Sequence, residues 1–397
     1  MEGFCQVWED SYNGARMRPY DPLVALNAHL LSGTASYRSA GISVYIANLL
    51  QHIGTDLDGL RFQILLGEGQ LPSGVRAPVT RSRMSTASPW RRILWEQLVL
   101  PRVVRRLNID LLHGAAFAGP LVAACPQVIT VHDLSFLRHP EFFRTGNRLY
   151  LRAITGASCR RAAAVIAVSD FTAREVVALL NVPAERVVTI YHGVAPRFKP
   201  LPADQVAAFR RRKGLPERFL LFLGTLEPRK NLIRLVRAFH KVHDPQLHLV
   251  LAGAQGWFYE DIYAEVARLQ LSDRVHFPGY VSAEEQAFWY NAARAFVYVS
   301  TYEGFGMPVL EALACSVPAV TASTTSLPEA GGGGALAVPP ADEAALADAL
   351  QRVVTDETLR ADLRARGLAH AAGFSWSTTA AKTLDLYHSV LKGEPRA

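Results

Sequence analysis

The chain has 397 residues, and 50% of them are hydrophobic, which excludes a disordered protein and favours roughly two or three folded domains. No apolar run reaches the about 18 residues of a membrane span, and residues 1–22 lack the apolar core of a signal peptide, so we expect a cytoplasmic protein with a poorly ordered N-terminal tail. The net charge of +7 falls in residues 1–197, which hold 21 arginines, no lysine and 14 acidic residues, and this asymmetry indicates a negatively charged partner on that side.

From Leu23 onward, short apolar runs alternate with longer amphipathic runs, the pattern of βαβ units with a parallel sheet. Ser169 is a predicted N-cap for a helix over residues 171–180. The strands predicted for the first half are Leu23–Ala28, Phe62–Leu66, Leu111–His113, Val128–Val131, Ala164–Val168 and Val187–Ile190.

A proline-rich segment then separates two similar halves, with a linker predicted at residues 196–202. We therefore expect an α/β protein with two Rossmann-like parallel-sheet domains, residues 23–195 and 203–374, facing each other across a cleft, and a final helix over 375–391. The four glycines of Gly331–Gly334 predict a flexible loop. The strands predicted for the second half are Phe219–Leu223, Leu247–Ala252, Val275–Phe277, Ala295–Val299, Ala319–Thr321 and Ala335–Val338.

The segment Val297–Ala314 reads as a strand, a loop and a helix that begins near Pro308. Gly304 and Gly306 allow the loop backbone to approach a ligand, and we expect Glu303 and Glu311 to face one crevice from the strand end and the first helical turn. Each carboxylate can accept hydrogen bonds from two hydroxyls, which suits a neutral polyol. The spacing alone is also compatible with a turn cap and an exposed helix residue.

A second cluster follows the strand Phe219–Leu223, which ends at Gly224. Arg229 and Lys230 precede the helix predicted from residue 232, where cations oppose the helix dipole. A bound diphosphate would relieve this conflict by lying between the helix amides and the two cations. The alternative is a solvated pair of basic residues.

Three further places are candidates for ligand contacts. Gly41 opens the helix after the first strand and can present its amide to a phosphate, and His132 closes the strand Val128–Val131. Gly253 and the pair Tyr280-Val281 follow strands of the second half. A structural hydrogen bond explains His132 as well, and turn chemistry explains the other positions equally well.

The string from Val297 to Ala314 closely resembles the E-x7-E signature of retaining glycosyltransferases of family 4, which have the GT-B fold, and the Glu-Pro-Arg-Lys-Asn string at 227–231 resembles the family's diphosphate-binding segment. The resemblance covers residues 23–391. It implies that the N-terminal domain takes the acceptor, that the C-terminal domain takes the donor nucleotide, and that residues 375–391 form a crossover helix that packs on the N-terminal domain.

The resemblance also implies roles for the candidate residues. His132 is expected to contact the donor sugar near the reacting carbon, and Glu311 to hold the ribose. Arg229 and Lys230 would hold the diphosphate, with Gly224 before them, and Gly253, Tyr280 and Val281 would border the base. The donor sugar would be held by Glu303 and by the loop amides of Gly304, Phe305 and Gly306.

Two motifs depart from the family pattern. Ser43 and Val44 replace Gly and Arg of the usual Gly-Ile-Gly-Arg-Tyr, which leaves Gly41 as the expected phosphate contact, and Tyr191-His192 precedes Gly-Val where Asn is commoner. The details look most like bacterial mannosyltransferases that build O-antigen and other polysaccharides. The implied reaction moves mannose from GDP-mannose to a hydroxyl of a glycan or polyprenyl-linked oligosaccharide, with retention of configuration.

No metal or other cofactor is expected. Asp56-Leu-Asp58 spells D-x-D, but it precedes a strand in a turn, and the four cysteines lack metal-ligand spacing. An NAD-dependent oxidoreductase is disfavoured because no G-x-G-x-x-G follows the first strand. A nucleotide-sugar binding protein without transferase activity is the alternative function.

Residues 76–106 contain eight arginines and a single acid, Glu96, with Trp90 and Trp95 among them. This pattern predicts an interfacial segment that docks on an anionic membrane surface, which would bring the protein to the inner face of the cell membrane and to a lipid-linked acceptor. A solvated basic surface with inward-packed tryptophans is the other interpretation. No nucleic-acid recognition motif accompanies the patch, so nucleic acid is not an expected partner.

Overall fold

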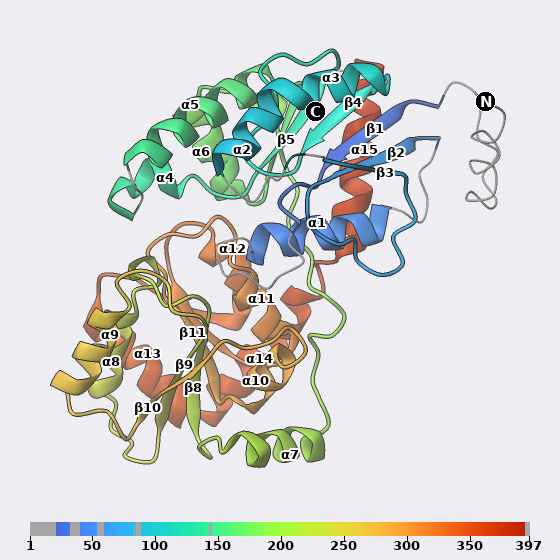
Figure 1. Cartoon of the computed structure of the whole chain (residues 1–397). Helices are drawn as coiled ribbons and strands as arrows, with labels where there is room; N and C mark the ends of the chain where they lie inside the picture. The colour runs from blue at the N-terminus through green and yellow to red at the C-terminus, as the bar shows by residue number, and fades with distance from the viewer. Residues whose placement is uncertain are drawn as a thin grey trace.

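The structure is a computed structural model that describes residues 21–31, 40–53, 59–82, 84, 89–142 and 145–393 (Figure 1). The predicted tail lies outside the described residues except for its last two positions, and Asp56-Leu-Asp58 lies outside them altogether. Within the described ranges, no helix is both long enough and apolar enough to cross a membrane.

The N-terminal domain contains a seven-stranded parallel sheet with the order β3-β2-β1-β4-β5-β6-β7. All six strands expected here are present, and a short exposed edge strand was missed because it has no apolar run to mark it. The strands are β1 (Leu23–Asn27), β2 (Arg61–Leu66), β3 (Val79–Arg81), β4 (Leu111–Gly114), β5 (Gln127–Val131), β6 (Ala164–Ala167) and β7 (Val187–Thr189).

The C-terminal domain contains a six-stranded parallel sheet with the order β10-β9-β8-β11-β12-β13. Every strand expected in this half is present, because each begins as a short apolar run; the four central strands are buried, and the edge strands β10 and β13 are partly exposed. The strands are β8 (Phe219–Leu223), β9 (His248–Ala252), β10 (Val275–Gly279), β11 (Ala295–Tyr298), β12 (Ala319–Ala322) and β13 (Ala335–Val338).

Helices cover both sheets, and Figure 1 shows the two domains stacked one above the other. The Ser169 hydroxyl accepts a hydrogen bond from the Thr172 amide, which confirms the predicted N-cap. The N-terminal helices are α1 (Ala40–Ile53), α2 (Pro89–Leu94), the π-helical turn η2 (Trp95–Val99), α3 (Leu100–Arg106), α4 (Ser135–Arg138), α5 (Thr145–Arg161) and α6 (Asp170–Leu180). The later helices are α7 (Ala203–Lys213), α8 (Leu232–His240), α9 (Glu260–Arg268), α10 (Gln286–Ala292), α11 (Met307–Ala314), α12 (Leu327–Gly331), α13 (Glu343–Thr355), α14 (Glu357–Ala371) and α15 (Trp376–Lys392). Short 3₁₀ turns are η3 (Pro140–Phe142), η4 (Ala184–Arg186), η5 (Pro228–Lys230) and η6 (Gly332–Gly334).

The last helix, α15, packs on the N-terminal domain although it follows the C-terminal domain in sequence (Figure 1). It lies against α1, and buried Trp376 and Tyr387 belong to the core around β1, β2 and β4. The Tyr387 hydroxyl lies 2.5 Å from Nδ1 of buried His113, in β4. The chain therefore crosses between the domains twice, and after the second crossing α15 packs on the N-terminal domain.

The glycine run at residues 331–334 is a packed element, and the expectation of a flexible loop was wrong. It ends α12 and forms the turn η6 against α14. A Cβ atom at Gly334 would lie 2.3 Å from the Cα atom of Gly367, so the two backbones touch. The run is glycine-rich at this point because a helix crosses it at backbone contact distance.

This contact generates a stability prediction. Gly334→Ala should lower the free energy of unfolding by about 1–3 kcal/mol, because the added methyl group forces η6 and α14 apart. The adjacent Gly333→Ala is the control, since a Cβ there would meet only the Arg366 side chain at 3.4 Å. Denaturant unfolding measures both variants, and equal stability of the two would contradict the packing described here.

Candidate functional site

The candidate site lies where the strand order of the C-terminal sheet reverses, between β8 and β11. In open α/β sheets, ligands bind in the crevice outside the carboxyl ends of the strands at such a switch point. The segment after β8 brings Arg229 and Lys230 there within η5, and the segment after β11 brings Glu303. The topology thus joins two motifs that are more than seventy residues apart in sequence.

Glu303 accepts hydrogen bonds from both cations. Its Oε1 atom lies 2.6 Å from Nζ of Lys230, and its Oε2 atom lies 3.1 Å from Nη1 of Arg229. Lys230 also donates to the Tyr298 hydroxyl at 2.6 Å, and Arg229 donates to Glu227 Oε1 at 2.8 Å. Lys230 is 6% exposed and Glu303 is 8% exposed, so this network is buried between the two segments.

The charges within this network balance, since two carboxylates face two cations. Burial alone would raise the pKa of Glu303, but the charges of Arg229 and Lys230 lower it to about 2. Burial and the neighbouring guanidinium lower the pKa of Lys230. Sequence analysis proposed that a diphosphate relieves the conflict of two cations with the α8 dipole; in the structure, Glu303 and Glu227 already pair with these cations.

Glu227 is a site residue that sequence analysis did not single out. It is 4% exposed and binds the guanidinium of Arg229 through Nε at 3.1 Å and Nη2 at 2.8 Å. Its position two residues before Arg229 was a signal, because a carboxylate so close to an Arg-Lys pair can orient the arginine. Together, Glu227 and Glu303 hold the guanidinium from both sides.

The glycine loop after β11 touches the N-terminal domain directly. The Gly304 carbonyl accepts hydrogen bonds from the hydroxyls of Ser169 at 2.6 Å and Thr172 at 2.9 Å. A Cβ atom at Gly304 would lie 1.7 Å from the His132 carbonyl oxygen, so any side chain there would push the domains apart. Gly306 has φ = 104°, and Phe305 between the two glycines is buried. The loop therefore brings the candidate donor residues against His132.

His132 is buried, and its Nε2 atom donates a hydrogen bond to the Ala115 carbonyl at 2.8 Å. Because the carbonyl can only accept, Nε2 carries the proton. Burial lowers the pKa of His132. The imidazole is thus neutral, with Nδ1 left as an acceptor. Its ring centroid lies 4.9 Å from that of Tyr45 in α1.

A second buried histidine, His192, lies 5.5 Å from His132 between ring centroids. Within the part of the chain that the structure describes, neither of its ring nitrogens has a hydrogen-bond partner, and burial lowers its pKa well below the usual value. It stacks on Trp376 and meets the edge of Phe305 at 5.5 Å. The sequence predicts no role for His192, although its presence where the family commonly has Asn is a signal that marks the position.

Glu311 differs from its predicted position. The helix α11 begins at Met307, which places Glu311 in the second turn rather than the first. Its carboxylate accepts a hydrogen bond from the Tyr290 hydroxyl of α10 at 2.8 Å, and burial raises the pKa of Glu311 to about 7. Glu303 and Glu311 thus have opposite pKa shifts, because only Glu303 has cations in contact with it.

The remaining candidates are distributed over both domains. Gly253, with φ = 147°, lies directly against Gly224, since a Cβ there would be 1.8 Å from the Gly224 carbonyl oxygen. Tyr280 is 58% exposed after β10, and Val281 is buried. Gly41 lies in the first turn of α1, and nothing lies within 4 Å of its Cβ position. Figure 1 shows α1 on the side of the N-terminal domain that faces the C-terminal domain.

The raised pKa of Glu311 generates a prediction for the ligand-free protein. Ionisation of Glu311 is disfavoured in the folded state. The free energy of unfolding therefore falls as pH rises from the pKa of the unfolded state, about 4.5, to that of the folded state, about 7, and the loss is complete above that range. Glu311→Gln should therefore gain stability over wild type by roughly 1–3 kcal/mol at pH 8 and little at pH 5. Thermal unfolding at both pH values measures the difference.

A gain that is the same at both pH values would contradict this burial-raised pKa. Glu284→Gln is the control, because Glu284 is an exposed glutamate in the same domain whose pKa is lowered by local hydrogen bonds. That variant should show no gain at pH 8.

Two family models match the chain, one for each domain. The model "Glycosyltransferase Family 4" matches residues 39–198, and "Glycosyl transferases group 1" matches residues 205–370. O-antigen chain mannosyltransferase B of Escherichia coli is 34% identical over 264 residues, which cover 66% of this chain and 69% of that protein. Serotype-specific mannosyltransferase WbdA of the same organism is 29% identical over 290 residues, but the chain spans only 34% of that longer protein.

Solved structures agree in fold. Sucrose-phosphate synthase from Thermosynechococcus elongatus superposes with a TM-score of 0.76 at 22% identity, covering 94% of this chain and 100% of that one. HepE of Anabaena, in complex with UDP and glucose, superposes with a TM-score of 0.74 at 19% identity, covering 93% and 100%. The two family models, the relative of 34% identity and the superposed structures agree: the chain belongs to glycosyltransferase family 4, with the GT-B fold.

Proposed function

We propose that this glycosyltransferase moves mannose from GDP-mannose to a hydroxyl of a glycan or polyprenyl-linked oligosaccharide, with retention of configuration and without a metal ion. The observation that carries the proposal is the buried Arg229–Lys230–Glu303 network at the switch point of the C-terminal sheet. The choice of mannose is supported by the likeness to the O-antigen chain mannosyltransferase. A nucleotide-sugar donor is supported by the UDP and glucose bound to HepE, which shares the fold.

The chemical task is to stabilise a departing diphosphate. Arg229 and Lys230 supply two positive charges in a site from which most water is excluded, and such preorganised charge acts strongly on developing negative charge. The arginine offers a forked contact and the lysine a point charge, so they provide the charge that a divalent ion supplies in metal-dependent enzymes. Metal independence follows from this assignment.

Glu303 has two roles in the proposal. It orients both cations, and its remaining lone pairs accept hydroxyls of the donor sugar, together with the amides of Gly304, Phe305 and Gly306. Two ion pairs make it a poor nucleophile, which disfavours a covalent double displacement. Neutral His132 then lies on the other wall of the cleft. Its Nδ1 atom, which is unprotonated in this tautomer, would accept a hydrogen bond from a hydroxyl of the sugar.

The nucleotide contacts are assigned to the same domain. Glu311 would bind the ribose hydroxyls, and Gly224 and Gly253 would let the backbone approach the nucleotide beside Tyr280 and Val281. The amide of Gly41, across the cleft, would bind a phosphate. The alternative of a binding protein without transferase activity is disfavoured by membership of a transferase family.

The experiment is a panel of nucleoside diphosphate sugars in the presence of a chelator, scored by release of the nucleoside diphosphate and by NMR of the anomeric product. GDP-mannose should be consumed fastest and give an α-linked product. Arg229→Gln should lower kcat/KM by roughly a hundredfold or more, because one charge-assisted contact to the leaving group is lost.

Arg237→Gln is the matched control. Arg237 lies on α8 and pairs with Glu265 on the surface, away from the site. Unchanged turnover in Arg229→Gln would contradict the diphosphate assignment, and consumption of a different sugar nucleotide in preference would contradict mannose. Complete dependence on a divalent ion would overturn the metal-independent mechanism.

A membrane role for the N-terminal domain is part of the proposal. Trp90, Leu94 and Leu98 are 71%, 52% and 54% exposed, and their spacing of four residues places them on one side of α2 and η2. Arg91, Arg102, Arg105 and Arg106 are exposed on the same helical segment. Trp95, by contrast, is buried, so the two tryptophans of the segment divide between membrane-facing and core positions.

An exposed apolar stripe flanked by arginines fits an anionic membrane surface. The apolar side chains enter the headgroup region, and each cation near an anionic leaflet contributes about 1 kcal/mol. A lipid-linked acceptor would then reach the protein at the surface where it is anchored.

Sedimentation with vesicles checks this proposal. The wild type should bind vesicles of phosphatidylglycerol and phosphatidylcholine but not pure phosphatidylcholine, and salt should weaken binding. Arg91→Glu with Trp90→Ser should abolish it. Arg211→Glu, on α7 of the other domain, makes the same change in net charge and is the control. Equal loss in that variant would show that net charge rather than the stripe controls binding, and wild-type protein that stays in the supernatant at low salt would overturn the proposal.

A further inference from the structure

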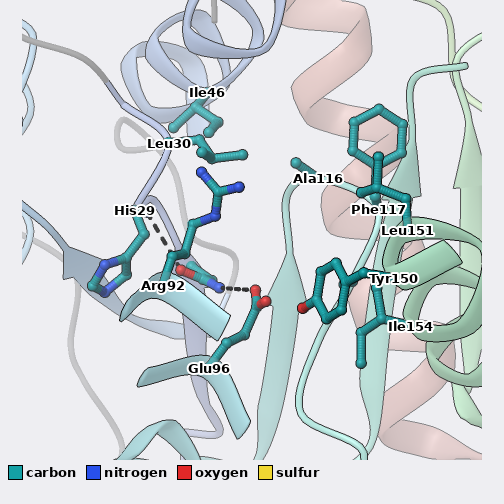
Figure 2. Close-up of a pocket in the computed structure, with 12 residues that line it drawn as sticks. His29, Leu30, Ile46, Arg92, Glu96, Ala116, Phe117, Tyr150, Leu151 and Ile154 are labelled. Atoms are coloured by element: carbon teal, nitrogen blue, oxygen red, sulfur yellow. Dashed lines mark hydrogen bonds between the residues drawn. The ribbon is translucent and has the colours of Figure 1, made fainter. Parts of the chain in front are cut away.

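A small cavity lies in the N-terminal domain apart from the residues assigned above. Its volume is about 60 Å³, and it is lined by side chains from β1, α1, α2, η2, α5 and the loop after β4 (Figure 2). A water-sized group needs roughly 10–15 Å³ of such space, so several ligand atoms fit.

The cavity occupies the switch point of the N-terminal sheet. The strand order turns between β1 and β4, and the cavity lies beyond their carboxyl ends, where Asn27 closes β1 and residues 116–118 follow β4. The donor site of the C-terminal domain occupies the corresponding point between β8 and β11. The N-terminal domain thus has a cavity, and the C-terminal domain a charged site, at the position where open α/β sheets bind ligands.

Five of the lining residues have polar side chains: Asn27, His29, Arg92, Glu96 and Tyr150. Figure 2 shows Glu96 and Arg92 approaching from one side and Tyr150 from the other. The Oε1 atom of Glu96 accepts a hydrogen bond from Nδ2 of Asn27 at 3.2 Å. Glu96 is held in the π-helical turn Trp95–Val99, anchored by buried Trp95, and such turns occur frequently at functional sites.

The chemistry of these groups matches a neutral sugar. One cation and one carboxyl group balance each other, so the cavity does not select an anion, and the carboxyl, amide and phenol groups together both donate and accept. The rings of Phe117 and Tyr150 offer apolar faces to the C–H groups of a pyranose.

The cavity shares a wall with the reaction cleft. The ring centroid of Phe117 lies 5.8 Å from that of His132, and Tyr45, which is next to the lining residue Ile46, lies 4.9 Å from His132. A sugar in the cavity is therefore separated from His132 by a single aromatic ring.

We infer that this cavity is an acceptor subsite, in which Glu96 and Asn27 hold hydroxyl groups of a neutral sugar residue of the acceptor. The inference rests on the proposed function, because it assigns the second substrate of the same reaction. Burial raises the pKa of Glu96 to about 7, as expected for a carboxyl group away from water. Burial, with the charge of Glu96, raises the pKa of Tyr150 to about 12, so its hydroxyl remains a donor.

The test uses Glu96→Gln, which keeps the shape of the side chain, with methyl α-mannoside as the acceptor probe. The acceptor KM should rise roughly tenfold or more, while the donor KM changes by less than about twofold, because only the acceptor loses a charge-assisted hydrogen bond. Tyr150→Phe should give the same split. Glu68→Gln, the same change at an exposed position of the same domain, is the control, and thermal unfolding of every variant verifies the fold.

Monodeoxy derivatives of the probe then identify the hydroxyl group. A derivative that lacks the hydroxyl held by Glu96 should lose affinity for the wild type but lose nothing further in Glu96→Gln, as a double-mutant cycle requires for two groups in contact. Equal additional losses for every derivative, or an acceptor KM in Glu96→Gln equal to that of wild type, would overturn the inference.

Failure of the proposed donor chemistry remains distinguishable. Binding of the same probe is measured by ligand-observed NMR without any donor present. If no sugar nucleotide is consumed by the wild type, the proposed transfer fails, while probe binding that is lost in Glu96→Gln and kept in Glu68→Gln still supports the subsite. Probe binding that is equal in both variants rejects it.

Discussion

The pairing of Glu303 with Arg229 and Lys230 is the interaction on which the site depends. Three charged groups lie between two loops, and each would be costly to bury alone. Together with Glu227 they satisfy one another, so the site keeps two cations in a nearly dry crevice before any substrate enters. If these two cations bind a diphosphate as proposed, they are already positioned in the crevice before it enters.

The position of this network relative to the N-terminal domain is set by close backbone contacts. Gly304 lies against the His132 carbonyl and accepts hydrogen bonds from α6. Glu329 of α12 accepts hydrogen bonds from the amides of Asp170 and Phe171, both at 2.8 Å, where the positive end of the α6 dipole favours a carboxylate. The two domains thus meet through contacts that tolerate no side chain at residue 304, and opening the cleft would break these hydrogen bonds together.

In the proposed mechanism the two domains have different tasks. We propose that the two cations at the C-terminal switch point, which are paired with two carboxylates, bind the diphosphate, and that the N-terminal cavity, with polar groups beside aromatic rings, binds hydroxyl groups. His132 and His192 lie between them, buried and neutral. Under the proposed assignment, the charged groups would lie beside the leaving group and the neutral histidines near the sugar.

The sequence by itself determined the two sheets, because apolar runs bounded by turns mark buried parallel strands, and only the short exposed strand β3 lacked this signal. It also determined the family and its candidate residues, because the Glu303 loop and the Arg229-Lys230 segment are each contiguous in the sequence and can be recognised there. Only the tertiary structure decided their partners. Three features depend on tertiary contacts or on burial, which the periodicity of a sequence does not show. They are the ion pair of Arg229 with Glu227, the ring nitrogens of His192, which have no partner among the described residues, and the cavity around Glu96. The glycine run at 331–334 shows the same limit. Its composition indicates a flexible backbone, but the packing of α14 against it fixes its position.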